Sequence, residues 1–255
     1  MQENEKDIQK LNNRLRELAE KSFQQNLFTF TGFLGLSEQD AFFRLERELS
    51  YAGCTLFGGR ENAERRMLRF GSPQEFGYDV PFPIVCIHIR PVAAKFADSL
   101  SHRDFLGALM NLGIERSTLG DIMAGDKEAY LFCADSMGDY ICEQLAQVRH
   151  TSVTCTITEN FEEIPTEEPV RQRIQVSSPR VDALLAKVYN KSRSDCLELF
   201  RAGRVFVDGR LCESNSRLLK GGETVNARGF GKFVYTGQTG ETRKGKLNVE
   251  VAVFR

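Results

Sequence analysis

The chain has 255 residues, of which 41% are hydrophobic and 27% are charged, the proportions of an ordinary folded protein. No stretch approaches the roughly 18 uninterrupted apolar residues that cross a bilayer, and the first ten residues are polar, unlike a secretory signal. The sequence therefore predicts a cytoplasmic protein of two or three domains, because single domains usually span about 100 to 150 residues.

The net charge of −1 conceals an uneven distribution of charge along the chain. Residues 171–255 hold 17 Lys and Arg against 8 Asp and Glu, whereas residues 1–170 hold 17 against 27. Clustered Lys and Arg gain affinity for phosphates because binding releases condensed counterions. The distribution predicts that residues 171–255 bind a polyanion.

The seven cysteines form no C-x-x-C pair, and their odd number does not indicate a disulfide framework. Cys86, Cys133 and Cys155 lie in apolar, strand-like runs and are expected to be buried thiols rather than metal ligands. We therefore expect neither a metal site nor a cofactor.

Hydrophobic spacing predicts an α+β protein. In residues 1–75 it indicates an N-terminal helical segment, with Leu15 and Leu18 in the first helix and a Ser37/Asp40 capping box before the second. In residues 76–158 strands alternate with helices, including a helix capped by Ser101 and a last helix that runs through Val148. Residues 159–170, rich in Glu and Pro, are expected to form an acidic linker.

Residues 171–255 carry the clearest signals. Ser178 begins a predicted helix, Ser192 or Ser194 caps a second, and Gly203 ends it, before short strands joined by tight turns at 208–209 and 220–222. The pattern predicts two short helices on a small sheet.

Basic residues are placed regularly on these helices. Arg180, Lys187 and Lys191 share one helical face, and Arg193 and Arg201 extend the set. The start of the second helix, beside the hydroxyls of Ser192 and Ser194, would suit a phosphate. A solvated charged face remains the simpler alternative for the helix alone.

The motifs R-V-D-x-x-L, N-K-S-R-S-D, F-R-A-G-R-V-F-V-D-G and K-G-G-E, within residues 179–228, resemble the alpha-L RNA-binding motif. That motif forms a small domain of ribosomal protein S-four, tyrosyl-tRNA synthetases, many pseudouridine synthases and a heat-shock ribosome-binding protein. The resemblance implies contacts with structured rRNA or tRNA through Arg180, Ser192, Arg193, Ser194, Arg201 and Arg204.

The stretch FLGALMNLGIERSTLGDI, the linker and the tail GFGKFVYTGQTGETRKGKLNVEV resemble YlmH-type proteins of Gram-positive bacteria. This resemblance covers nearly the whole chain and implies a ferredoxin-like, RRM-like RNA-binding domain at 76–158 and an alpha-L domain at 171–255. It implies a protein that binds rRNA and tRNA on the large ribosomal subunit, in quality control of subunits obstructed by peptidyl-tRNA, with a looser link to cell division. We expect this protein to be a monomer.

Two further stretches approach known motifs. RGFGKFVY at 228–235 resembles an RNP1 octamer but departs at Lys232 and Phe233, so strand packing is favoured over base stacking by Phe230 or Tyr235. GETRKGKL at 240–247 has a P-loop frame, yet Leu247 replaces the required Ser or Thr. A basic hairpin tip, with cations that reach a phosphate backbone, is the favoured interpretation; these cations are Arg243, Lys244 and Lys246.

Two alternatives stay open. One is an RNA-modifying enzyme, or its targeting subunit, with catalysis in the middle domain around Asp121, Asp126 or Asp135. No catalytic motif supports it, since the three histidines lack partners at motif spacing and no glycine-rich cofactor loop is present. The other is a protein adaptor that works through the acidic N-terminal part. We expect a non-catalytic RNA-binding protein.

Overall fold

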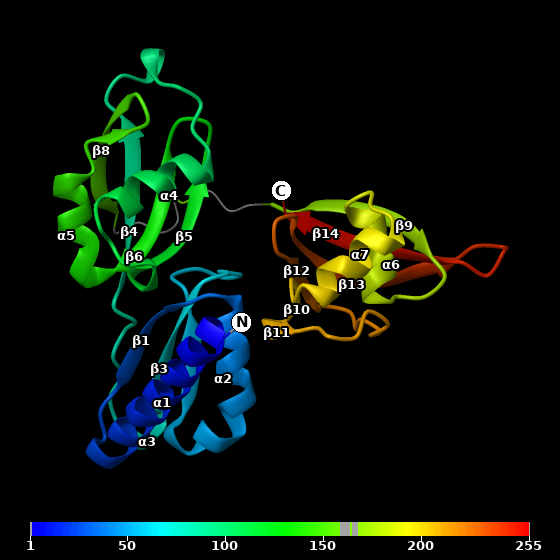
Figure 1. Ribbon diagram of the computed structural model, residues 1–255, viewed down its shortest axis with the longest axis horizontal. Helices are drawn as coiled ribbons and strands as arrows, with labels where there is room; N and C mark the ends of the chain where they lie inside the picture. The colour runs from blue at the N-terminus through cyan, green and yellow to red at the C-terminus, as the bar shows by residue number, and fades with distance from the viewer. Residues whose placement is uncertain (1, 159–163, 165–167, 255) are drawn as a thin grey trace. The chain divides into compact units, whose positions relative to one another are not determined.

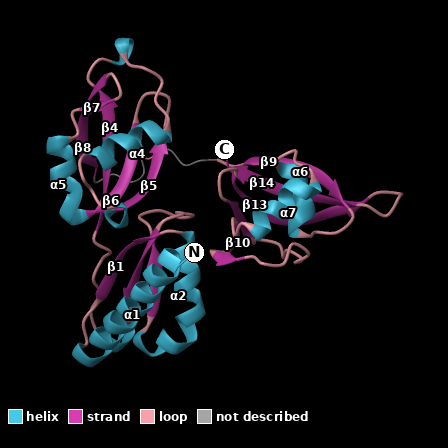
Figure 2. Cartoon of the chain, viewed as in Figure 1, coloured by secondary structure: helices cyan, strands magenta, loops and turns pink. Residues whose placement is uncertain are grey.

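The computed structural model describes residues 2–158, 164 and 168–254, with side chains from residue 6 onward. The chain divides into two compact units, Met1–Ile164 and Pro165–Arg255. Both units combine helices with antiparallel strands (Figures 1 and 2), so the predicted α+β class is confirmed. None of the helices in the described part of the chain is long and apolar enough to cross a membrane.

The first unit begins with two helices, α1 (Gln2–Gln25) and α2 (Leu36–Leu49), that pack on a small sheet (Figure 1). This sheet has the order β1-β3-β2, with β1 at Thr29–Leu34, β2 at Cys54–Phe57 and β3 at Arg66–Phe70. The prediction of an N-terminal helical segment therefore missed three strands. All three strands are short, and four consecutive residues of β3 are buried, so β3 lacks the alternation of a half-exposed strand.

The start of α2 also differs from its prediction. Helix α2 begins after Gly35, whose N–H donates to the Glu38 carboxylate at 2.6 Å, so the proposed Ser37/Asp40 cap lies two residues too far along the chain. Leu15 and Leu18 of α1 are buried, as their spacing predicts. Short helical turns lie at Ser50–Ala52 (η1) and Pro73–Phe76 (α3).

The middle of the chain folds into a five-stranded sheet of order β5-β6-β4-β8-β7. The chain order β4-α4-β5-β6-α5-β8 is the βαββαβ arrangement of ferredoxin-like folds, as expected for this region. The elements are β4 (Ile84–Pro91), η2 (Ala94–Phe96), α4 (His102–Asn111), η3 (Arg116–Thr118), β5 (Leu119–Ala124), β6 (Ala129–Ala134), α5 (Asp135–Gln144), β7 (Gln147–Val148) and β8 (Thr151–Thr158).

The ends of the two middle helices test the local predictions. Ser101 caps α4 through a capping box with Asp104, as predicted. Helix α5 ends at Gln144, and Val148 lies in β7, so the helix predicted to run through Val148 is wrong there. Arg149 adopts a left-handed φ of 52°, which turns the chain into β8 and excludes a continuous helix.

The two sheets of the first unit share a small core. Phe33 and Met67 of the first sheet pack with Cys86 and Phe132 of the second. Ile164, expected within the linker, is buried in the same cluster. The rest of the predicted linker at 159–163 and 165–167 lies outside the described residues, while its last residue, Val170, already belongs to a strand.

The second unit places α6 (Val181–Val188) and α7 (Arg193–Arg201) on a six-stranded sheet of order β11-β10-β12-β13-β14-β9. The predicted pair of short helices is present, but the sheet is larger than expected, because the long hairpin of β13 and β14 extends it and β9 adds a strand at the edge. The strands are β9 (Val170–Val176), β10 (Val205–Val207), β11 (Arg210–Leu211), β12 (Thr224–Ala227), β13 (Gly231–Glu241) and β14 (Leu247–Phe254).

Helix α6 starts after Arg180, not at Ser178. Leu219 N–H donates to the Pro179 carbonyl, and Arg180 forms an isolated antiparallel bridge with Leu218, so these residues stay extended. The predicted end of α7 at Gly203 is confirmed by its left-handed φ of 62°.

Candidate nucleic-acid interface

Four of the basic residues predicted to bind RNA line one hollow of about 560 Å³ in the second unit. They are Lys187, Lys191, Arg193 and Lys246. Helix α6 and the turn that follows it supply the two lysines, α7 begins with the arginine, and the β13–β14 hairpin contributes Lys246. The structure therefore brings together cations that lie up to 59 residues apart in the sequence.

Local backbone geometry explains how these cations meet. Asn190 has a left-handed φ of 50°, and the Lys191 N–H donates to the Ala186 carbonyl, so the chain reverses tightly between the two helices. In the sheet, Leu247 pairs with Val176, which places the neighbouring Lys246 at the end of β9. The hollow thus lies between a helical turn and a strand edge.

The electrostatics of the hollow favour an anion. All four cations are exposed, and none of them forms an ion pair with another residue in the part of the chain that the structure describes. The Lys191 ammonium lies 5.3 Å from the centre of the Phe230 ring, which is 37% exposed. The positive charge around the hollow is therefore not neutralised by an ion pair within the described chain, and Asp195 is an ionised carboxylate close to Lys191.

Three other predicted RNA-binding arginines are engaged within the fold. Arg180 makes a bidentate pair with the buried carboxylate of Asp182, at 2.7 and 3.0 Å. Arg201 pairs with Glu198 one turn earlier in α7, and Arg204 donates to the Arg228 carbonyl at 2.6 Å. These side chains are held by intramolecular partners, in contrast to the four around the hollow.

At the start of α7, where a phosphate was predicted to bind, side chains of the helix itself already use part of the site. Ser192 caps the helix, because its hydroxyl accepts from the Asp195 N–H at 3.1 Å while the Asp195 carboxylate accepts from the Ser192 N–H. Hydrogen bonds from Ser192 lower the pKa of Asp195, so this carboxylate stays ionised at neutral pH. Ser194 shares a hydrogen bond with the Ser192 hydroxyl. The serines have a structural role, and Asp195 places negative charge where a phosphate was expected.

Ser192→Ala is expected to lower the free energy of unfolding by about 1 kcal/mol, the usual cost of losing a helix cap. Because the hydroxyl is used inside the helix, RNA affinity should change little when measured well below the melting temperature. Urea unfolding and an RNA titration of the same sample separate the two effects. A loss of affinity with unchanged stability would show that the hydroxyl contacts RNA directly.

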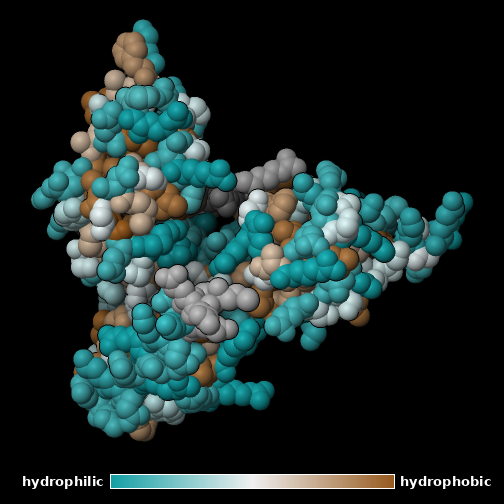
Figure 3. All heavy atoms as spheres, viewed as in Figure 1, coloured by the Kyte–Doolittle hydropathy of each residue, from teal (hydrophilic) through white to brown (hydrophobic). Residues whose placement is uncertain are grey.

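The remaining predicted cations, Arg243 and Lys244, lie in the turn between β13 and β14 and are exposed. Thr242 closes this turn, because its N–H donates to the Lys246 carbonyl at 2.7 Å and its hydroxyl accepts from the Lys246 N–H. The hairpin projects from the sheet, with hydrophilic residues at its end (Figures 1 and 3). The predicted basic hairpin tip is confirmed as a structure, and the P-loop frame of 240–247 forms no loop-to-helix junction.

The RNP1-like octamer is mainly a packing element. Phe233 and Tyr235 of β13 are buried in the core of the second unit, as the strand-packing interpretation predicts. Of the aromatic residues in this octamer only Phe230 is exposed, and it packs on Tyr189 with ring centres 5.7 Å apart. Base stacking by this octamer could therefore involve Phe230 but not Tyr235.

The carboxylates named for the enzyme alternative have structural partners. Asp121 accepts from the backbone N–H groups of Glu64 and Arg65 at 2.9 Å, and Asp126 accepts from the Ser99 hydroxyl. Asp135 accepts from the N–H of the next residue in the first turn of α5. Among the described residues no group of three or more His, Cys, Asp or Glu is placed to hold a metal ion.

Sequence spacing missed several contacts. His88 pairs with Glu128 at 3.0 Å and stacks on Tyr130, because strands β4 and β6 are neighbours although the residues are 40 positions apart. Three uncharged polar residues that also line the hollow were not predicted as site residues: Gln175, Ser177 and Asn190. The three cysteines in strand-like runs are buried, as expected, and burial raises the pKa of the Cys133 thiol to about 12.

Comparison with known proteins identifies the middle of the chain. Residues 79–162 match the family described as "Putative RNA-binding domain in YlmH". The chain is 29% identical over 202 residues to the ribosome-associated protein quality control protein P2 of Bacillus subtilis (strain 168), covering 77% of this chain and 76% of that protein. The solved structure of the cell division protein ylmH from Streptococcus pneumoniae has a similar fold, with a TM-score of 0.50 and 18% identity over 62% of this chain and 95% of that one.

Proposed function

We propose that this chain, whose residues 79–162 match the putative RNA-binding domain of YlmH and which resembles a ribosome-associated quality control protein over most of its length, is a YlmH-type, non-catalytic RNA-binding protein of ribosome-associated quality control. It binds structured rRNA or tRNA on the large ribosomal subunit. In this proposal residues 171–255 form an alpha-L domain that supplies most of the affinity, and residues 76–158 form a second RNA-binding domain.

The observation that carries the proposal is the group of four unpaired cations around one hollow of the second unit. Phosphates are the ligands that such a group binds best, because each contact releases condensed counterions. Helices α6 and α7, the turn between them and the β13–β14 hairpin place the cations around one hollow, which suits a folded RNA with regularly spaced phosphates. The relative named for ribosome-associated quality control indicates the ribosome as the source of that RNA.

Sedimentation with purified ribosomal subunits tests this function. The protein is expected to travel with large subunits at low salt and to leave them when the KCl concentration is raised, because phosphate contacts are screened. Small subunits provide the control for general affinity for RNA. A protein that stays at the top of the gradient at low salt would contradict the proposal.

The same purified protein can be used to test the alternative that the chain is an RNA-modifying enzyme. Incubation with bulk tRNA or rRNA, followed by mass spectrometry of the nucleosides, should show no new modification. A modified nucleoside that depends on the protein would favour the enzyme, with the middle domain as the place to look for its catalytic residues.

A further inference from the structure

The proposed interface leaves one sequence stretch without a role. FLGALMNLGIERSTLGDI, which carries the resemblance of the middle domain, forms most of α4, the turn η3 and the start of β5. Buried residues of α4, such as Phe105 and Leu109, face the core. Gly107, Ala108 and Asn111 of the helix, with Leu112 just after it, also line a separate surface hollow.

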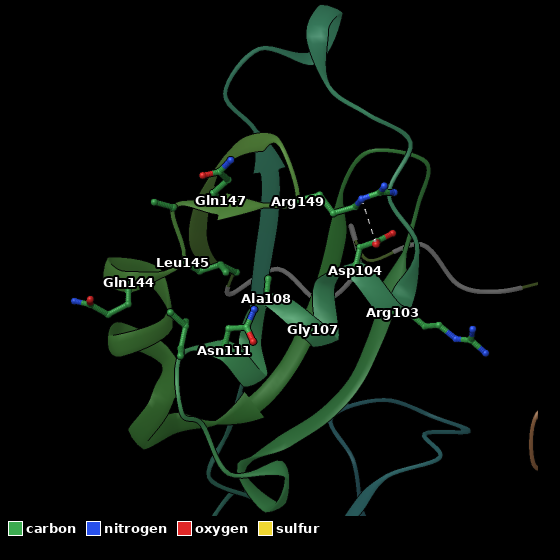
Figure 4. Close-up of a pocket in the computed structure, with 11 residues that line it drawn as sticks. Arg103, Asp104, Gly107, Ala108, Asn111, Gln144, Leu145, Gln147 and Arg149 are labelled. Atoms are coloured by element: carbon green, nitrogen blue, oxygen red, sulfur yellow. Dashed lines mark ion pairs between the residues drawn. The ribbon is translucent and has the colours of Figure 1, made fainter.

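This second hollow, of about 550 Å³, lies between α4 and residues 144–149, which comprise the end of α5, the short strand β7 and the residue after it (Figure 4). Ala108, Leu112 and Leu145 give it apolar walls, and Asn111 and Gln147 carry amide groups beside them. Arg103 and Gln144 extend from its rim, and Arg149 reaches toward Asp104 (Figure 4). An apolar surface with a few well-placed polar groups is typical of a ligand-binding site.

Gly107 is the least expected residue of this hollow. It lies inside α4, where glycine destabilises a helix relative to alanine. A Cβ built at this position meets no atom within 4 Å, so packing within the chain does not require glycine. A ligand backbone that passes close to the helix would require it, because any side chain would occupy that space.

Arg149 is the second unusual residue. Its backbone has a φ of 52°, a conformation that residues with a side chain seldom adopt. The turn holds the guanidinium at the mouth of the hollow, where its Nε lies 3.7 Å from an oxygen of Asp104. The hydroxyl and the backbone N–H of Ser101 donate hydrogen bonds to the Asp104 carboxylate, and these bonds, together with the charge of Arg149, lower the pKa of Asp104. The ion pair between Arg149 and Asp104 is long by comparison.

We propose that this hollow is a second RNA contact, independent of the cations in the second unit, and that it takes an unpaired nucleotide. The sugar and phosphate pass over Gly107, the base lies against Ala108 and Leu112, and the amides of Asn111 and Gln147 bind its polar edge. Arg103 and Arg149 reach the flanking phosphates. Side-chain amides offer a donor and an acceptor together, which is the pattern of a base edge.

Charge and shape favour RNA over a protein segment here. The charged residues that border the hollow are two arginines and one carboxylate. The carboxylate already has partners within the chain, Ser101 and Arg149. Sequence-specific contacts with RNA are made mostly to unpaired bases, whose edges are free and whose faces can stack on an arginine guanidinium. The domain that contains the hollow is the one that matches an RNA-binding family.

The test uses the full chain and two RNAs: a hairpin from large-subunit rRNA, and the same hairpin with a short single-stranded tail. The wild type is expected to bind the tailed RNA about tenfold more tightly, which corresponds to about 1.4 kcal/mol of binding free energy. Gly107→Ala should abolish this preference, leave affinity for the plain hairpin unchanged and not lower the melting temperature. Arg149→Asn, which tolerates the left-handed backbone, should also reduce the preference.

Met110→Ala serves as the control, because Met110 is exposed on the same helix but does not line the hollow. A Gly107→Ala protein that keeps the full preference for the tail would overturn the inference, as would a wild type that binds both RNAs equally. Binding to neither RNA would instead defeat the proposed function itself. If Gly107→Ala binds both RNAs normally but no longer binds large subunits, the hollow takes a protein and the inference is wrong.

Discussion

Replacing Lys187, Arg193 and Lys246 together with glutamate is expected to weaken binding to folded rRNA or tRNA by about a hundredfold or more. The three side chains border one hollow and have no ion-pair partner in the described chain, so each reversal removes an attraction to phosphate and adds a repulsion. Because all three are exposed, the melting temperature should remain near that of the wild type. Fluorescence titration with tRNA and with an rRNA hairpin gives the affinities.

A charge-matched control is available in the first unit. Lys10, Arg14 and Lys21 are exposed on α1, so replacing them with glutamate changes the net charge by the same amount. This control should lose little affinity if the hollow is the site of binding. Equal losses in the two triple variants would mean that only the total charge matters, and the hollow would not be a site.

Asp121→Ala is expected to lower the free energy of unfolding of the first unit by about 2 to 4 kcal/mol. The Asp121 side chain is 10% exposed and accepts from two backbone N–H groups and from Arg60. Without it these donors lose their acceptor, and the half-buried Arg65 loses a nearby negative charge. Urea unfolding followed by circular dichroism measures the change.

The same substitution distinguishes structure from catalysis. Asp139→Ala, at an exposed position on α5, is the control and should change stability by less than about 0.5 kcal/mol. If Asp121→Ala leaves stability unchanged and removes an RNA-modifying activity, the residue is catalytic and the enzyme alternative is correct. If the substitution lowers stability and no RNA-modifying activity is found, Asp121 has the structural role that its contacts between the two sheets of the first unit indicate.

Local signals in the sequence predicted much of the fold. The Ser101 and Ser192 caps and the left-handed Gly203 depend on neighbouring residues, and the structure has all three. The strands of the N-terminal sheet were missed because their burial depends on partners distant in sequence: Phe70 pairs with both Thr29 and Cys54. Such pairings leave no periodic trace in a short strand that is buried on both faces.

The candidate interface was predictable in composition but not in arrangement. The helical spacing of Arg180, Lys187 and Lys191 was visible, yet only the fold shows that Asp182 holds the first of them. Nothing in the spacing brought Lys246 to the end of β9, because the pairing of β14 with β9 joins residues about 70 positions apart. The sequence therefore identified the cations, and the tertiary structure separates the free ones from the paired ones.

The salt dependence of RNA binding tests the central claim most directly. With about four to six phosphates neutralised, a plot of log affinity for an rRNA hairpin against log KCl concentration should have a slope of about −3 to −5 in the wild type. The variant with glutamate at 187, 193 and 246 should show a slope smaller in magnitude by about 3, because each lost phosphate contact removes about one unit. Equal slopes in the two proteins, or a wild-type slope near zero, would show that these cations are only a solvated face.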